Sequence, residues 1–85
     1  MAHYYFHMRD GTRIEDPEGR RIRGGVEAVR EVALLEAREV IAECAKAGID
    51  ATARVFEIAD ETGQTVLTVP FRDSIIPERF LHEPL

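Results

Sequence analysis

The chain has 85 residues, of which 45% are hydrophobic and 32% are charged, and its formal net charge is −5 at pH 7. This length and composition predict one small folded domain and exclude a disordered chain. The negative charge disfavours general nucleic-acid binding, because such binding depends on neutralising phosphate charge.

A single cysteine, Cys44, excludes an internal disulfide and a cysteine-based zinc site. No apolar run is long enough for a signal peptide or a membrane span, so we expect a cytoplasmic protein that does not enter a membrane.

Residues 3–9 alternate as expected for a half-buried strand. One side presents Tyr4, Phe6 and Met8, and the other presents His3, Tyr5, His7 and Arg9. We expect the first set in the core and the second on the opposite face of the sheet, called the far face below. Asp10-Gly11 then predicts a hairpin turn, and residues 13–15 a short return strand.

Residues 16–19 read Asp-Pro-Glu-Gly, a strong turn signal, and residues 20–23 could continue the sheet edge. Gly24-Gly25 breaks the strand and opens a long helix over residues 26–47, which Gly48 ends as a left-handed cap. The buried stripe of this helix is Val26, Val29, Ala33, Ala37, Val40, Cys44 and Ala47. Leu35 lies nearly opposite that stripe.

Residues 53–59 and 65–71 predict two more strands, joined by a hairpin over residues 60–64. Alternation places Val55 and Val66 on the far face with Tyr5 and His7. The predicted fold is α+β with the order ββαββ: a small, mostly antiparallel, four-stranded sheet with one long helix packed on one face. This domain spans residues 1–73.

The tail, residues 74–85, contains Phe80 and Leu81 and is too apolar for a free terminus. It either covers the domain itself or docks on a partner subunit.

Few residues have the spacing that catalysis or metal binding requires. His3 and His7 share a face but lie about 13 Å apart along a strand, whereas two ligands of one zinc ion each lie about 2 Å from it. A shared site with His82 of another subunit is a weaker alternative. We expect Cys44 to pack in the core, and we expect the helix flank formed by Glu36, Glu39 and Glu43 to face solvent. No catalytic residue, metal or cofactor is predicted.

Arg20, Arg21 and Arg23 precede Gly24-Gly25 at the start of the helix. Free backbone N–H groups and nearby guanidinium groups there could bind phosphate or carboxylate. The pattern matches neither phosphate-loop nor dinucleotide fingerprints, and the glycines could simply serve as the helix cap.

The blocks 3–11 (His-Tyr-Tyr-Phe-His-Met-Arg-Asp-Gly), Asp16-x-Glu18-Gly19 and 66–71 (Val-Leu-Thr-Val-Pro-Phe) occur in order around an Ala- and Glu-rich helix. This order resembles a family of short bacterial proteins known only as a domain of unknown function. The resemblance covers roughly residues 3–73. It supports the architecture and implies no activity, cofactor or site.

The sequence therefore favours a non-enzymatic interaction domain that self-associates as a homodimer. The candidate interface residues are Tyr5, His7, Leu35, Val55, Val66, Phe80 and Leu81. The alternative is a regulatory module that binds an anion or nucleic-acid phosphate through Arg20, Arg21, Arg23, Gly24 and Gly25. An enzyme is the weakest reading, and no small-molecule ligand can be named.

Overall fold

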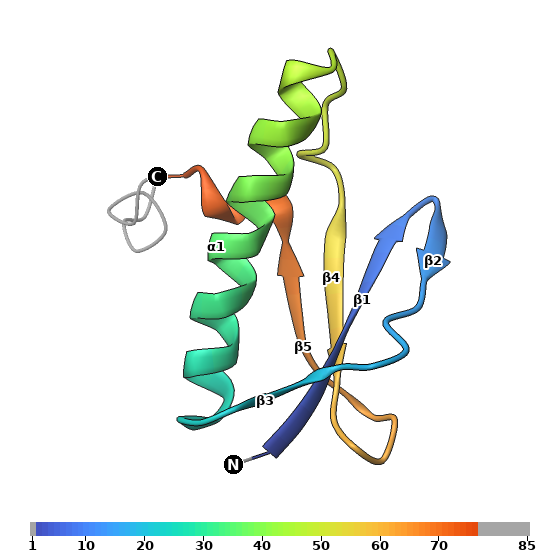
Figure 1. The fold of residues 1–85 in the computed structure, drawn as a ribbon, viewed down its shortest axis with the longest axis vertical. Helices are drawn as coiled ribbons and strands as arrows, with labels where there is room; N and C mark the ends of the chain where they lie inside the picture. The colour runs from blue at the N-terminus through green and yellow to red at the C-terminus, as the bar shows by residue number, and fades with distance from the viewer. Residues whose placement is uncertain (1, 77–85) are drawn as a thin grey trace, which may run out of the picture.

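A computed structural model describes residues 2–76 of the chain. The elements in chain order are β1 (Ala2–Asp10), β2 (Thr12–Ile14), β3 (Arg20–Ile22), α1 (Gly25–Lys46), β4 (Val55–Ala59), β5 (Thr65–Pro70) and the 3-10 helix η1 (Phe71–Ser74). They form one antiparallel sheet with α1 against one of its faces (Figure 1). The predicted α+β fold is confirmed.

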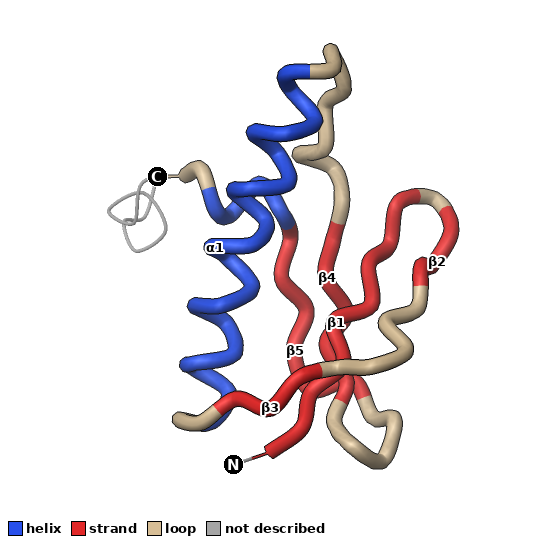
Figure 2. Tube along the Cα trace, in the orientation of Figure 1, coloured by secondary structure: helices blue, strands red, loops and turns tan. Residues whose placement is uncertain are grey.

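The sheet runs in the order β2-β1-β4-β5, and β3 also pairs with β1. β2 pairs with the second half of β1, where Met8 faces Ile14, and β3 pairs with the first half, where Tyr4 faces Arg20. Residues 20–22 thus continue the sheet edge after the turn, as the sequence suggested, and they form a separate strand, which gives five strands instead of four; the loop between β2 and β3 is seen in Figure 2. Residues 15–19 form this connection.

The core lies between α1 and the sheet, as the two periodicities predicted, but the two ends of the expected helix stripe, Val26 and Ala47, are exposed. Val29, Ala33 and Ala37 are fully buried on the helix. They pack against Tyr4, Phe6, Phe56, Ile58, Val69 and Phe71. The two alanines leave room for the aromatic rings of the sheet, since interiors pack at near-crystalline density. Phe56 contacts Phe6 edge-on at 5.7 Å and Phe71 at 4.7 Å between ring centroids.

Both ends of α1 depend on glycine, as the sequence suggested. Gly24 is the N-cap at φ 109°, and no side chain caps this end. At the other end Gly48 has φ 78°. Its N–H donates to Ala45 O at 3.0 Å, and the N–H of Ile49 donates to Cys44 O at 2.8 Å. This pair of bonds is a Schellman motif, which requires a left-handed residue at Gly48.

Two expectations for β5 need correction. A bulge shifts the β4–β5 register between Ile58 and Ala59, and Val66 consequently packs against the core cluster instead of lying on the far face. Phe71 begins η1 instead of ending the strand. Its N–H still donates to Arg54 O at 2.9 Å, and its side chain is fully buried, as expected.

The chain after β5 packs on α1. Ser74 is buried, and its carbonyl oxygen accepts hydrogen bonds from Arg38 Nε at 3.0 Å and Nη2 at 2.8 Å. The part of the predicted tail that includes Phe80, Leu81 and His82 lies outside the described residues. Within residues 2–76, no helix is long and apolar enough to cross a membrane.

Candidate functional site

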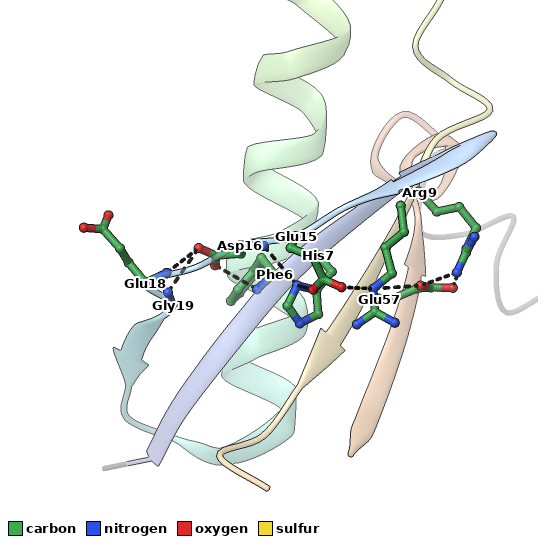
Figure 3. Close-up of polar contacts among 9 residues, drawn as sticks. Phe6, His7, Arg9, Glu15, Asp16, Glu18, Gly19 and Glu57 are labelled. Atoms are coloured by element: carbon green, nitrogen blue, oxygen red, sulfur yellow. Dashed lines mark hydrogen bonds and ion pairs between the residues drawn. The ribbon is translucent and has the colours of Figure 1, made fainter. Parts of the chain in front are cut away.

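The connection over residues 15–19 closes onto β1 and fixes His7. The backbone N–H of Asp16 donates to His7 Nδ1 at 3.0 Å, and the N–H of Phe6 donates to Asp16 Oδ2 at 3.0 Å (Figure 3). Because β2 has ended and β3 has not begun at this point, the Asp16 carboxylate takes the place of a strand partner for Phe6.

The second carboxylate oxygen of Asp16 holds the connection in shape. Oδ1 accepts the N–H of Gly19 at 3.1 Å and that of Glu18 at 3.3 Å. Burial alone would raise the pKa of Asp16, but the three N–H donors of Phe6, Gly19 and Glu18, with the charge of Arg20, outweigh it and lower the pKa. Asp16 is therefore a charged, structural residue.

His7 is only 9% exposed although it lies on the far face. Since its Nδ1 accepts the Asp16 N–H, the neutral ring carries its proton on Nε2. Glu15 Oε2 also lies 2.9 Å from Nδ1. That contact is a hydrogen bond only when Nδ1 itself carries a proton, and a protonated Nδ1 cannot accept the Asp16 N–H, so the two contacts at Nδ1 exclude each other.

A row of paired charges continues from His7 across the far face. Arg9 on β1 donates to Glu57 on β4 through Nε at 2.9 Å and Nη2 at 3.2 Å. Arg13 Nε lies 3.4 Å from Glu15 and 3.9 Å from Glu57. The hydrogen bond between Arg9 and Glu57 raises the pKa of Arg9 and lowers the pKa of Glu57, so both stay charged.

Aromatic rings occupy the other half of the far face. Tyr5 lies between the two histidines: its ring centroid is 5.1 Å from His3 and 6.2 Å from His7, and it stacks nearly parallel to the latter. His3 Nε2 is 2.7 Å from the carbonyl oxygen of Glu18. His3 and His7 are thus separated by a ring, and residues 2–76 contain no group of three metal-ligating side chains.

The structure separates the arginines of the predicted anion site. Arg20 turns toward α1, where its guanidinium lies 4.4 Å from the Phe6 ring centroid and Nη2 donates to Glu36 Oε1 at 3.0 Å. Arg21 pairs with His3 in the register and therefore lies on the far face. Gly24 and Gly25 both have positive φ, which the turn into α1 requires. An anion site around Arg21 and Arg23 stays a prediction, without Arg20.

Glu36 differs from the solvated flank expected of it. Its Oε2 atom is buried and lies 2.9 Å from Arg20 Nη1. The two groups are not aligned for a hydrogen bond, so this contact is mainly electrostatic. Glu43 contacts Lys46 at 3.3 Å, and both are exposed, as expected of a solvated flank. The sequence analysis did not find the ion pair between Arg9 and Glu57, because the two residues belong to strands far apart in sequence. Their shared position on one face can be recognised only when the pairing of β1 with β4 is known.

The expected interface residues lie on two sides of the molecule. Tyr5, His7 and Val55 share the far face, whereas Leu35 is 59% exposed on the side of α1 that faces away from the sheet. Val66 contacts the core. One two-fold interface cannot use both sides at once, so the interface itself stays a prediction.

The single serine, Ser74, and the single cysteine, Cys44, both have structural roles. The Ser74 hydroxyl donates to Phe71 O at 2.8 Å. Cys44 packs against the core cluster, as expected. On the far face, His7, Arg9 and Glu57 have polar partners within the domain.

The molecule is a small α+β domain in which one helix covers a five-stranded antiparallel sheet. Residues 3–72 match the family model described as Domain of unknown function (DUF6894), and the chain belongs to this family. The expected membership of a domain-of-unknown-function family is confirmed. No curated protein and no solved structure matches the chain.

Proposed function

We propose that this domain is a non-enzymatic interaction module that self-associates as a homodimer. The observation that carries the proposal is the exposed apolar surface of so small a domain. Among residues 2–76, five large hydrophobic side chains are about half exposed: Ile14, Val26, Leu35, Ile49 and Ile75, at 45–59%. Covering apolar surface of this kind stabilises an assembly by roughly 25 cal/mol per Å² buried.

The size of the domain supports a second source of stability. A chain of this length buries only about 60–65% of its unfolded surface. Its large, fully buried side chains are few: Phe71, Ile58, Val29 and Val69. A partner subunit that covers more apolar surface adds to this small core.

The polar residues support recognition in preference to catalysis. His7 Nδ1 accepts the Asp16 N–H, and Arg9 and Glu57 neutralise each other across two strands. General base catalysis needs a free lone pair within reach of a substrate proton, and acid catalysis needs a proton it can release. The groups on this face are instead committed to holding β1, β4 and residues 15–19 together.

Light scattering coupled to size exclusion tests the proposal. At micromolar concentration we expect a mass of about 19 kDa, twice the 9.6 kDa of one chain. Dilution into the nanomolar range should lower the average mass, because association depends on protomer concentration. A mass of 9.6 kDa that does not change up to the highest soluble concentration would refute self-association.

A further inference from the structure

A groove opens between the last turns of α1 and the loop that follows the helix. Its volume is about 370 Å³, which lies within the range of sites that hold a ligand. The apolar lining comes from Ile41 and Ala45 on α1 and from Ile49 and Ala51 in the loop. Ile49 is 50% exposed. The groove therefore holds apolar surface that residues 2–76 leave uncovered.

The described part of the chain ends on the same side of α1. Arg38, Ile41 and Ala45 follow one another at intervals of three and four residues, so they lie on one side of the helix. The guanidinium of Arg38 donates to Ser74 O at 3.0 and 2.8 Å, which holds the end of η1 beside the middle of α1 (Figure 1). From Arg38 to Ala45 the helix rises only about 10 Å. The chain thus leaves η1 close to the groove.

The sequence that follows is long enough and apolar enough to fill the groove. Phe80 comes four residues after Ile76, and four extended residues span up to about 13 Å. Residues 77–85 contain three large apolar side chains, Phe80, Leu81 and Leu85. Ile75, just before this segment, is 52% exposed and continues the apolar surface from η1.

The groove also offers a charge that complements the segment. Asp50 belongs to its lining, and Asp50 Oδ1 accepts the Thr52 hydroxyl at 2.6 Å and the Thr52 N–H at 2.9 Å. These two bonds lower the pKa of Asp50, so its carboxylate stays charged. Arg79 directly precedes Phe80 in the sequence. An aromatic ring in the groove therefore brings a guanidinium within reach of a carboxylate.

We propose that residues 77–85 fold back within their own chain and place Phe80 and Leu81 in the groove. A segment joined to the groove by so few residues has a high effective concentration there. A second copy would supply the same side chains only at the additional cost of lost translational and rotational freedom. The segment of the same chain is therefore the favoured occupant.

This inference goes beyond the proposed self-association, because it concerns contacts within one chain. A docked segment covers Ile49 and Ile75. It leaves Ile14, Val26 and Leu35 exposed for a partner subunit.

Tryptophan fluorescence of the whole chain tests the inference, since the sequence contains no tryptophan. Phe80→Trp places the only probe in the segment. We expect its emission at a shorter wavelength than in the same protein unfolded in urea, with weaker quenching by acrylamide. Adding Ala45→Lys, which puts a long charged side chain in the groove, should shift the emission to longer wavelength. Ala42→Lys is the matched control, because Ala42 is equally exposed on α1 but does not line the groove.

Each result of this experiment decides for or against the groove. A probe that is as accessible as in urea overturns the inference, and so does an equal shift with Ala42→Lys and Ala45→Lys. The protection should persist on dilution into the nanomolar range, because a contact within one chain does not depend on concentration. Loss of protection on dilution would assign the groove to a second copy and overturn the inference. A chain that is monomeric at every concentration refutes self-association alone.

NMR of the unmodified protein decides the question if a variant does not fold. We expect contacts between the Phe80 ring and the methyl groups of Ile41, Ala45 and Ile49. A mixture of labelled and unlabelled chains shows whether these contacts lie within one chain, as the inference requires. Contacts found only between chains, or a Phe80 ring that contacts none of these methyl groups, would overturn it.

Discussion

Asp16 Oδ2 accepts the backbone N–H of Phe6 at 3.0 Å, at the one point of β1 where neither β2 nor β3 supplies a partner. A side chain thus completes a strand ladder that the backbone leaves open. The same residue donates its own N–H to His7, so one turn residue fixes both the core strand and the far face.

Asp16→Asn should destabilise the domain by about 1–3 kcal/mol, because an amide nitrogen would face one of the N–H donors and leave it unsatisfied. Urea unfolding measures the change. Glu18→Gln is the control, since only the backbone of Glu18 contributes to this network. Equal stability of Asp16→Asn and the wild type would show that the carboxylate does not hold the connection.

The contribution of Asp16 should also depend on pH. Its pKa in the folded protein lies below the ordinary 3.8, so the folded state binds the proton less tightly than the unfolded chain. The carboxylate therefore stabilises the fold above about pH 4, and this stabilisation is lost as the pH falls through the lowered pKa. The difference in unfolding free energy between the wild type and Asp16→Asn should shrink from about pH 5 to about pH 2. A constant difference over that range would contradict the assignment.

Gly19 has no room for a side chain. A Cβ atom there would lie 2.6 Å from Tyr4 O and 2.8 Å from Tyr5 Cδ2, and φ is +64°. Gly19→Ala should therefore cost more than about 1 kcal/mol. Gly63→Ala is the control: φ is +88°, but nothing lies within 4 Å of its Cβ position. Thermal unfolding of the two variants separates the clash from the backbone strain, and equal melting temperatures would argue against close packing at Gly19.

Arg20→Gln should destabilise the fold by about 1 kcal/mol, because Arg20 would lose its contacts with Glu36 and the Phe6 ring. The effect is modest because the Arg20 and Glu36 side chains are only partly shielded from water. The loss should diminish at high salt. Arg23→Gln, at an exposed position in the turn before α1, should change stability by less than about 0.5 kcal/mol. If Arg20→Gln were as stable as Arg23→Gln, Arg20 would be available for the anion site that the sequence suggested.

Ala37→Leu should destabilise the domain by about 1–3 kcal/mol, because a larger side chain cannot fit between α1 and the sheet. Ala37 is fully buried, whereas Ala42 is exposed on the same helix. Ala42→Leu is therefore the matched control, with little change expected in the midpoint of urea unfolding. Equal midpoints for the two variants would mean that α1 does not pack on the sheet through Ala37.

Local chemistry was sufficient where one segment decides the outcome. The alternation of residues 3–9 assigned Tyr4 and Phe6 to the core, and Gly48 was recognised as the end of the helix. Val66 was misplaced because a bulge depends on both strands of a pair, and alternation along one strand does not reveal it. Glu36 was misplaced because its partner, Arg20, belongs to a different element.

The sequence by itself determined the α+β class, the helix, the two hairpins and the inner faces of β1 and β4, because period and turn chemistry act within a few residues. Only the tertiary structure decided that Asp16 closes the gap between β2 and β3 and reaches His7, and that Arg9 meets Glu57. These contacts join residues far apart along the chain, and their energies exist only once strand order and register are set. That β5 lies at one end of the sheet within residues 2–76 likewise follows from strand order, which no local pattern contains.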